Sequence, residues 1–491
     1  MHSASTPEQT AVEGAGVQTA PERARDQPQP AHHLPMRPNP DISVPMATRT
    51  PALDGWLGVE AVRDARKRTR DLVRHTPVLT SRSLSDECGG TVFLKAENLQ
   101  RTGSFKLRGA LAKVDRIAAA ADGEAGSGAA GRGSVVAGSA GNHAQSLAYA
   151  ARARGLDCEV FMPAEASLAK VAAVKGFGGT VRLGGDSVDV CVTAARERAA
   201  ETGAIFVHPF DDPEIVAGQG TLALELLEDI DDIATVIVPV GGGGLIGGIA
   251  GVLKAARPAV RVIGVQVESS SAYVASLERG EPVEGGGGPT IADGIAIKRP
   301  GGLVLPLVQA WVDELVVAAE NDVAEAMVLL LERAKLVVEG AGAVGVAALL
   351  SGAIVPAERG ATVIVLSGGN VDAGVLASVA LRHETAEGRR LRFFTRVEDR
   401  PGGLARLLTC VAEAGGNLVT VTHVREAVPL HVRQTGVDLV LETRGAEHAA
   451  EIVAALERAG YGIERLADGA VGRPAARGGD RLESPGMGAG S

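Results

Sequence analysis

Short runs of β-branched and aliphatic residues alternate with amphipathic helical patterns through most of this chain, and this alternation restricts the fold more than any other feature. Apolar runs at residues 91–95, 135–138 and 362–366 predict strands. The segment 59–73 is typical of the helices expected between such runs. Because parallel strands are joined by helical crossovers, the pattern predicts an α/β fold with a mainly parallel, open sheet.

The same pattern continues along the chain. Ala144, Leu147, Ala148 and Ala151 follow the i, i+3, i+4, i+7 spacing of a helix face. Further strands are expected at residues 159–162, 235–240 and 261–267. Residues 118–134 are rich in glycine and alanine, and we expect them to form a surface loop.

Residues 391–466 have a different order, strand–helix–strand–strand–helix–strand. The expected strands are 391–398, 417–424, 436–443 and 461–466, the first helix is 402–414, and the second carries Ala449, Ile452, Val453 and Leu456. This order is typical of a ferredoxin-like βαββαβ domain.

Four regions are therefore expected: a disordered tail at 1–48, a catalytic domain at 49–388, a ferredoxin-like domain at 389–468 and a second disordered tail at 469–491. The first tail holds eight of the 24 prolines and no aromatic residue, and the second has seven glycines in 23 residues. Such segments cannot bury enough apolar surface to offset the entropy lost on ordering. Met46 is an alternative start of translation.

Composition excludes several classes of partner. The chain has 49 Lys and Arg against 59 Asp and Glu, a net charge of −10, which argues against nucleic-acid binding. Its four cysteines form no C-x-x-C pair or zinc motif, which favours a reducing, cytoplasmic compartment and no metal site. No apolar run is long enough to span a membrane. A small molecule is the expected partner.

Four glycines follow the apolar strand expected at 235–240 and open a helical segment: Gly241, Gly242, Gly243 and Gly244. Backbone amides at the positive end of a helix form an anion site suited to phosphate. The glycines at 285–288 follow no strand and are interpreted as a loop. Since no G-K-[ST] motif is present, nucleoside triphosphates fit poorly.

A lysine stands in the motif G-S-F-K-L-R-G-A at residues 103–110. Lys106, next to Phe105 and small residues, is a candidate for a desolvated amine that forms an imine. Taken alone, the motif is better explained by an ordinary solvated lysine. Together, an imine-forming amine and a phosphate loop describe pyridoxal phosphate.

Two further motifs follow expected strands. One is S-A-G-N-H, formed by Ser139, Ala140, Gly141, Asn142 and His143, and the other is S-G-G-N at 367–370. Ligands bind at the carboxyl ends of strands in open α/β sheets, where all these loops meet. Helix capping is the alternative interpretation of the first motif.

These motifs together resemble the fold-type II, tryptophan-synthase-β-like pyridoxal phosphate enzymes, and among them most closely the threonine ammonia-lyase family. The resemblance covers residues 57–384. Its motifs are H-T-P-V-L-T-S-R-S-L at 75–84, K-A-E-N-L-Q-R-T-G-S-F-K-L-R-G-A at 95–110, S-A-G-N-H-A-Q at 139–145, A-G-Q-G-T at 217–221, the four glycines, T-I-A-D-G at 290–294, E-G-A-G-A at 339–343 and S-G-G-N.

The resemblance implies a role for each residue. It makes Lys106 the Schiff-base lysine and general base, Phe105 a neighbour of the cofactor, Asn142 the partner of its 3-hydroxyl, Gly241–Gly244 the phosphate site, Ser367 the partner of the pyridine nitrogen, and Ser139–His143 the substrate-carboxylate site. The implied reaction removes water from L-threonine and gives 2-oxobutanoate and ammonia, with L-serine as a secondary substrate that gives pyruvate.

Three alternatives remain. Serine racemases resemble this fold, but they typically read S-S-G-N where this chain has Ala140, and carry a metal-binding glutamate where it has Gln266. A β-replacement enzyme such as a cysteine synthase would need a better leaving group than hydroxide. A non-catalytic amino-acid sensor would not need Lys106, Asn142 and Ser367.

The C-terminal region resembles an ACT domain, a ferredoxin-like amino-acid sensor. The resemblance rests on Asp399, Arg400, Pro401, Gly402, Gly403 and Leu404, and on Asn417 in G-G-N-L. It implies an allosteric site for isoleucine or valine, in a homo-oligomer such as a dimer or tetramer. The alternative is a packing or dimerisation module that binds nothing.

Overall fold

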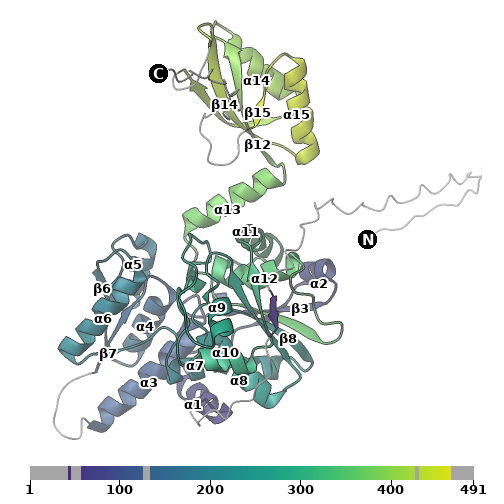
Figure 1. Ribbon diagram of the computed structural model, residues 1–491. Helices are drawn as coiled ribbons and strands as arrows, with labels where there is room; N and C mark the ends of the chain where they lie inside the picture. The colour runs from purple at the N-terminus through teal and green to yellow at the C-terminus, as the bar shows by residue number, and fades with distance from the viewer. Residues whose placement is uncertain (1–42, 46–56, 125–132, 426–430, 466–491) are drawn as a thin grey trace, which may run out of the picture. The chain divides into compact units, whose positions relative to one another are not determined.

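The computed structural model describes residues 43–45, 57–124, 133–425 and 431–465, all within the compact unit Pro38–Ser491. Three sheets organise these residues (Figure 1). Two of them belong to the predicted catalytic region and the third to the C-terminal region.

The largest sheet has seven strands. In spatial order they are β1 (Ser43–Pro45), β10 (Glu314–Ala318), β9 (Arg261–Val267), β8 (Ile233–Pro239), β11 (Ala361–Leu366), β3 (Thr91–Ala96) and β2 (Val78–Thr80). The five strands from β10 to β3 are mutually parallel, and the two edge strands are antiparallel to their neighbours. The predicted open, mainly parallel sheet is confirmed.

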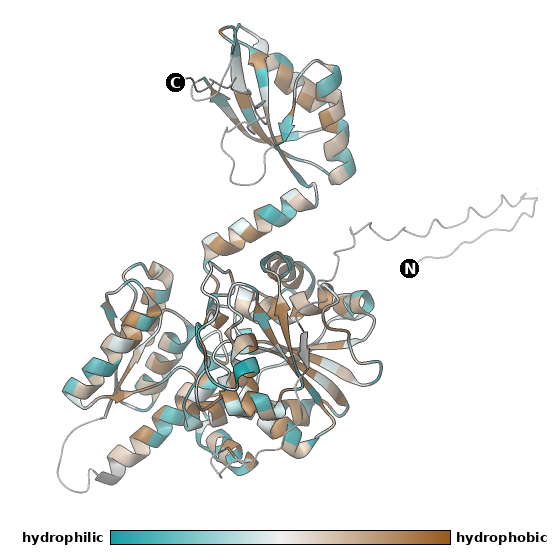
Figure 2. Cartoon of the chain, viewed as in Figure 1, coloured by the Kyte–Doolittle hydropathy of each residue, from teal (hydrophilic) through white to brown (hydrophobic). Residues whose placement is uncertain are grey.

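Helices cover both faces of this sheet, because its strands are apolar on both sides. Val236 and Val363 pack into one core with α1 (Val59–Thr69), α7 (Pro213–Asp229), α8 (Gly244–Ala256), α9 (Ala272–Arg279) and α10 (Leu305–Trp311). Ile237 and Ile364, one residue further along each strand, pack into the opposite core with α2 (Arg82–Cys88), α11 (Glu320–Leu329) and α12 (Gly340–Leu350). Brown predominates in the central strands in Figure 2, in agreement with this double burial.

The second sheet is smaller and fully parallel. Its order is β6 (Thr180–Leu183), β5 (Asp157–Met162), β4 (Ser134–Gly138) and β7 (Ile205–Phe206). The accompanying helices are α3 (Lys106–Glu124), α4 (Asn142–Ala153), α5 (Leu168–Gly176) and α6 (Val188–Thr202). Leu107 and Leu111 of α3 share a buried core with Leu147 of α4.

The third sheet belongs to the C-terminal domain. Along the chain run β12 (Arg390–Glu398), α14 (Gly403–Glu413), β13 (Asn417–Val424), β14 (Gln434–Glu442), α15 (Ala446–Arg458) and β15 (Glu464–Arg465). The antiparallel spatial order is β13-β14-β12-β15, with Phe393, Leu439 and Ile452 in the core. The predicted βαββαβ order is confirmed, although the last strand is shorter than expected.

Four shorter or connecting elements complete the described chain: η1 (Glu97–Leu99), η3 (Asp293–Ile295), η4 (Leu330–Ala334) and α13 (Ala373–Ala386). None of the described helices has the length and hydrophobicity needed to cross a membrane.

Two predictions about irregular segments need correction. The expected loop at 118–134 is helical as far as Glu124, because the alanines at 118–121 are strong helix formers that extend α3. Within the expected tail at 1–48, Ser43–Pro45 forms β1, where Pro45 is tolerated because the strand lies at a sheet edge. The rest of that tail and residues 469–491 lie outside the described residues.

Candidate active site

The four glycines lie between β8 and α8, and they have no room for side chains. A Cβ atom on Gly242 would lie 2.2 Å from the Phe210 ring, and one on Gly243 would lie 1.8 Å from the Tyr273 hydroxyl oxygen. Gly243 also has a φ of +94°, a conformation that favours glycine. The Tyr273 hydroxyl donates to the Gly242 carbonyl at 3.0 Å and fixes the loop from behind. The loop therefore presents backbone alone at a helix N-terminus, as anion binding requires.

Lys106 is the first residue of α3 and points its amine into the same region. Its Nζ donates to the Pro209 carbonyl at 2.8 Å and lies 5.3 Å from the centre of the Phe105 ring. Burial lowers the pKa of Lys106 to about 8, because desolvation disfavours the ammonium form. A usable fraction of the amine is therefore neutral near neutral pH, as a nucleophile or base requires.

A tight turn after β7 supplies the lysine's partner. The Nδ1 atom of His208 accepts hydrogen bonds from the backbone N–H groups of Phe210 at 3.3 Å and Asp211 at 2.8 Å. Burial lowers the pKa of His208 to about 4, so the ring is neutral and Nδ1 can accept. This turn places Pro209 and Phe210 against Lys106 and the glycine loop, and the sequence motifs gave no signal for it.

A second group of polar residues faces the cavity from α4 and the start of α12. Asn142 donates through Nδ2 to the Glu339 carboxylate at 2.7 Å and accepts at Oδ1 from Asn370 Nδ2 at 2.7 Å. Burial, followed by the nearby charge of Asp293, raises the pKa of Glu339 to about 7. Glu339 and Asn370 lie inside motifs that carry the family resemblance, but no role was predicted for either.

Two serines complete this region. Ser367 follows β11, is buried, and directs its hydroxyl towards the Ala341 carbonyl at 3.4 Å. Ser104 is also buried, and its hydroxyl is one of three buried side-chain polar atoms without a hydrogen-bond partner among the described residues. An unpaired hydroxyl beside Lys106 is suited to a polar ligand group, because burying it without a partner is costly.

These groups converge on one cavity of about 490 Å³, which includes space open to solvent. Its walls are formed by Phe105, Lys106, Asn142, Pro209, Phe210, Gln219, Pro239, Gly241–Gly244, Leu245, Gly294, Ile295, Glu339, Ala341 and Ser367. All the predicted cofactor-binding residues are brought together here.

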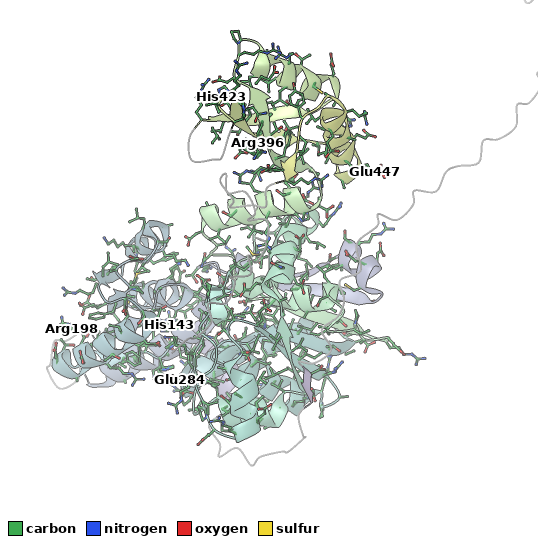
Figure 3. The ribbon with its side chains drawn as sticks, turned by 45° about the horizontal axis from the view of Figure 1, so that its top comes forward. His143, Arg198, Glu284, Arg396, His423 and Glu447 are labelled. Carbon is green, nitrogen blue, oxygen red and sulfur yellow. The ribbon has the colours of Figure 1, made fainter. Side chains whose placement is uncertain are left out.

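The predicted substrate group is only partly brought to the cavity. Of residues 139–143, Asn142 alone is among the lining residues. His143 is buried and its Nε2 pairs with the Val207 carbonyl at 3.0 Å, while burial lowers its pKa to about 3 (Figure 3). The Ser139 hydroxyl accepts from the N–H of Gly141 at 3.3 Å, but Gly141 is itself the N-cap of α4, and this helix has no side-chain capping hydrogen bond. The carboxylate role of Ser139–Gly141 and His143 remains a prediction.

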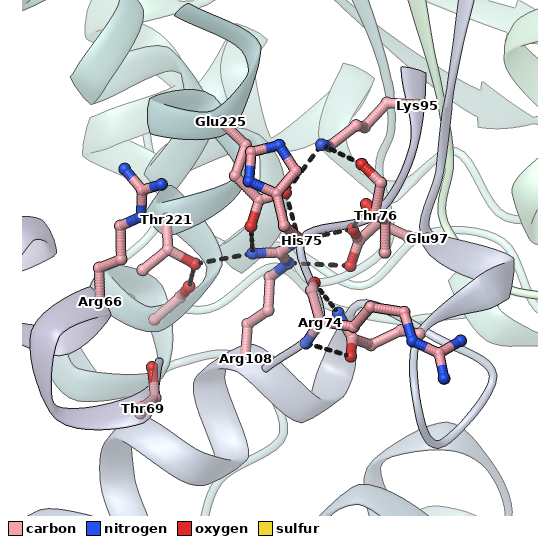
Figure 4. A network of polar contacts seen from close by, with 12 residues as sticks. Arg66, Thr69, Arg74, His75, Thr76, Lys95, Glu97, Arg108, Thr221 and Glu225 are labelled. Atoms are coloured by element: carbon pink, nitrogen blue, oxygen red, sulfur yellow. Dashed lines mark hydrogen bonds and ion pairs between the residues drawn. The ribbon is translucent and has the colours of Figure 1, made fainter. Parts of the chain in front are cut away.

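A buried ion-pair network fixes the first turn of α3 (Figure 4). Arg108 donates to both oxygens of Glu97, at 2.9 and 2.7 Å, and to both oxygens of Glu225, at 2.6 and 2.9 Å. Lys95 lies 2.7 Å from Glu225, and all four side chains are buried. Two cations balance two carboxylates, which offsets the cost of removing them from water. Lys106 is thus two residues from an anchor formed by β3, η1 and α7.

The predicted regulatory residues begin immediately after β12. Asp399 forms two 2.9 Å contacts with Arg425, and Gly402 has a φ of +83° where α14 starts. Asn417, at the start of β13, donates to Glu442 at 2.7 Å. Asp399–Leu404 lie between the end of β12 and the start of α14, whereas Asn417 lies at the opposite end of the sheet, paired with Glu442 and level with the start of β12. The structure therefore does not bring all the predicted regulatory residues together, and their effector role remains a prediction.

Comparison with known proteins identifies the class. Residues 69–368 match the model of the family described as pyridoxal-phosphate dependent enzyme. The cavity fits that cofactor, because it combines a desolvated lysine amine with a glycine loop that has no room for a Cβ atom. The chain belongs to this family and is a pyridoxal phosphate enzyme.

Individual relatives narrow the family further. The chain is 44% identical over 407 residues to the L-threonine ammonia-lyase of Thermotoga maritima, covering 83% of this chain and 99% of that protein. It belongs to the threonine ammonia-lyase family. A solved threonine deaminase from Solanum lycopersicum matches with a TM-score of 0.62 and 29% identity, over 71% of this chain and 98% of that one. A maize serine racemase matches with a TM-score of 0.61 and 33% identity, over 67% and 99%.

Proposed function

We propose that this chain catalyses the pyridoxal-phosphate-dependent elimination of water from L-threonine, which yields 2-oxobutanoate and ammonia, with L-serine as a secondary substrate that gives pyruvate. The observation that carries the proposal is the Lys106 amine, with a lowered pKa, in one cavity with the glycine loop and Ser367. The name of the Thermotoga maritima relative supports the same activity.

Lys106 has two tasks in this reaction. Its neutral amine would hold the cofactor, and its Nζ atom would accept the proton from the α-carbon of the substrate. Pyridoxal phosphate, when bound, supplies the electron sink that makes this proton removable. The Pro209 carbonyl holds Nζ by a hydrogen bond of 2.8 Å, which keeps the base inside the cavity.

Ser367 and the glycine loop orient the cofactor. Gly241–Gly244 would hold the phosphate, and Ser367 would meet the pyridine nitrogen. A serine hydroxyl carries no fixed negative charge, so it does not favour protonation of that nitrogen as a carboxylate would. Ser367 would therefore leave the pyridine nitrogen uncharged.

The direct test measures ammonia and 2-oxo acid release by the purified protein with threonine, serine or O-acetylserine, while the visible spectrum is recorded. Stoichiometric 2-oxobutanoate from threonine is expected. A bound cofactor without threonine turnover, but with reaction of O-acetylserine and an added nucleophile, would instead identify a β-replacement enzyme. Absence of cofactor would favour the non-catalytic sensor.

Serine racemisation is the second candidate, favoured by the similarity to the maize racemase. Two residues argue against it. Ala140 has no proton to deliver to the opposite face, and the amide of Gln266 is occupied by the Val240 carbonyl at 3.4 Å and the Tyr273 N–H at 3.2 Å. We expect no D-serine from the wild-type protein and a trace from Ala140→Ser. Chiral chromatography measures D-serine in both proteins. D-serine formed by the wild-type protein would overturn the argument from Ala140 against racemisation.

We further propose that the C-terminal domain binds isoleucine or valine and regulates the enzyme. The βαββαβ fold and the glycine turn at Gly402 support this assignment. Calorimetric titration with each amino acid tests it, using the full chain and a variant that lacks residues 390–491. Binding that persists without the domain would move the effector site elsewhere, and absence of binding by the full chain would leave only a packing module.

We also propose a cytoplasmic homo-oligomer, a dimer or tetramer. All four cysteines, including the buried Cys158 and Cys191, are free, which fits a reducing compartment. Light scattering at several protein concentrations measures the oligomeric state, and a monomer throughout would contradict this part of the proposal.

A further inference from the structure

Glu339 is the second ionisable group of the cavity, and its side chain is closely packed. The residue precedes α12 and is 3% exposed. A Cβ atom on Gly368 would lie 2.3 Å from Glu339 Oε1, and one on Gly294 would lie 3.3 Å from it. Two glycines from separate loops therefore make the space that this side chain occupies.

The carboxylate has hydrogen-bond donors but no ion pair among the described residues. Oε1 accepts from Asn142 Nδ2 at 2.7 Å, and the backbone N–H of Asn370 is a second donor. A buried carboxylate without a paired cation holds its proton more tightly than one in water.

Three charged side chains face Glu339 from other elements. Asp293 of η3 raises its pKa, whereas Lys170 of α5 lowers it, and Lys106 of α3 feels its charge in turn. Lys170 is committed to Asp293 at 2.6 Å and lies 3.6 Å from Asp372, so it does not neutralise Glu339 alone. Burial and Asp293 prevail, and the pKa of Glu339 rises to about 7.

A chain of amides fixes which way Asn142 points. Asn370 Nδ2 donates to the Thr102 carbonyl at 2.8 Å and to Asn142 Oδ1 at 2.7 Å. The oxygen of Asn142 is therefore held by one neighbour, and one of its two N–H groups is held by Glu339. The other N–H is left for a ligand in the cavity.

We infer that Glu339 is a positioning residue that acts through Asn142: its ionised carboxylate orients and polarises the Asn142 amide towards the cofactor, and protonation of the carboxyl group weakens that contact. The inference rests on the proposed contact between Asn142 and the cofactor. The charge-assisted hydrogen bond becomes a neutral one when the proton is taken up. Cofactor binding and the cofactor spectrum consequently change together near neutral pH.

Glu339→Gln is the decisive variant, because an amide imitates the protonated acid in size and as an acceptor. The visible spectrum and fluorescence of the bound cofactor are recorded from pH 5.5 to 9 in the purified holoenzyme, a range that extends roughly one to two units either side of the expected midpoint. The dissociation constant of the cofactor is measured over the same range. The wild type is expected to show a transition near pH 7. The variant is expected to show the wild-type low-pH spectrum throughout and about ten-fold weaker binding.

Asp293→Asn is the matched second variant. It keeps the contact between Glu339 and Asn142 and removes the charge that raises the pKa of Glu339, so the transition should move to lower pH. It also keeps the inference testable if Glu339→Gln does not fold. A transition that persists in Glu339→Gln, or that stays in place in Asp293→Asn, would overturn the inference.

The spectral test is independent of the reaction. A protein that binds the cofactor and shows the transition but does not deaminate threonine would disprove the proposed activity and leave the role of Glu339 standing. Normal threonine turnover without any transition near neutral pH would do the reverse.

Discussion

Two walls of the cofactor cavity are built in different ways. The glycine wall, Gly241–Gly244, consists of backbone, and its shape depends on the absence of side chains. The amide–carboxylate wall, Asn142 and Glu339 with Asn370 behind them, consists of polar side chains that hold one another. The first wall is therefore sensitive to added volume and the second to lost hydrogen bonds. Lys106 reacts between the two.

Removal of Lys106 tests whether the two walls can support threonine turnover without the lysine. Lys106→Ala is expected to lower threonine turnover by at least ~10³-fold and to remove the absorbance of the lysine-linked cofactor. Ammonia release and the visible spectrum measure these effects. Lys175→Ala, at an exposed position of α5, is the control and should behave as wild type. Retained threonine deamination in Lys106→Ala would remove the central assignment.

Gly242→Ala tests the glycine wall. The new methyl group would overlap the Phe210 ring at 2.2 Å, and relief of such overpacking costs about 1–3 kcal/mol. Cofactor affinity should fall by roughly 10- to 100-fold, as measured by fluorescence titration. Gly374→Ala, where a Cβ atom meets nothing within 4 Å, is the matched control. Unchanged affinity in Gly242→Ala would show that the loop is not the phosphate site.

Asn370→Ala tests the amide–carboxylate wall. The change leaves Asn142 Oδ1 and the Thr102 carbonyl without their donor, at a cost of about 1–2 kcal/mol. We expect cofactor affinity to fall by about ten-fold, less than in Gly242→Ala. Asn321→Ala, at an exposed contact with Arg382, should have no effect. A larger loss of cofactor affinity than in Gly242→Ala would show that the amide–carboxylate wall contributes more to cofactor binding than the glycine wall.

Deprotonation of Lys106, which lies between the two walls, is expected to change the rate of cofactor uptake with pH, by less than the substitutions above change activity or affinity. Because the pKa of Lys106 is lowered to about 8, its amine is neutral above that pH and protonated below it. The rate at which the cofactor-free protein takes up pyridoxal phosphate should rise about five-fold between pH 7 and 8 and level off beyond. Stopped-flow absorbance measures this rate. A rise that continues towards pH 10 would indicate a solvated lysine.

The two walls also differ in how far the sequence predicts them. The glycine wall was predicted because an apolar strand followed by four glycines is a local pattern. The role of Glu339 was not, because its contact with Asn142 joins residues 197 positions apart and depends on how α12 packs beside η3. The ring of His143, which belongs to the predicted substrate motif, contacts the Val207 carbonyl and does not line the cavity, and its role remains a prediction.

The secondary structure was likewise predicted correctly where it depends on a local sequence pattern, and missed where it depends on distant residues. The bounds of the strand Arg261–Val267 were predicted to the residue, since burial on both faces leaves a mainly apolar run. The helical residues 118–124 were missed, because glycine and alanine together suggested a loop whereas the alanines alone favour a helix. Ser43–Pro45 has no periodic signal, and its strand depends on pairing with the distant β10.

The first turn of α3 has a consequence for how such an enzyme can diversify. Leu107 and Leu111 pack in the core of the smaller sheet, whereas Arg108 is bonded to Glu97 and Glu225, which belong to the larger one. The position of the Lys106 amine is thus fixed through Arg108 by the half of the catalytic domain that holds the larger sheet, whereas residues from both halves surround the amine. Mutations that reshape the smaller half can change which amino acid is admitted while the lysine stays in register, so substrate preference and chemistry can evolve separately.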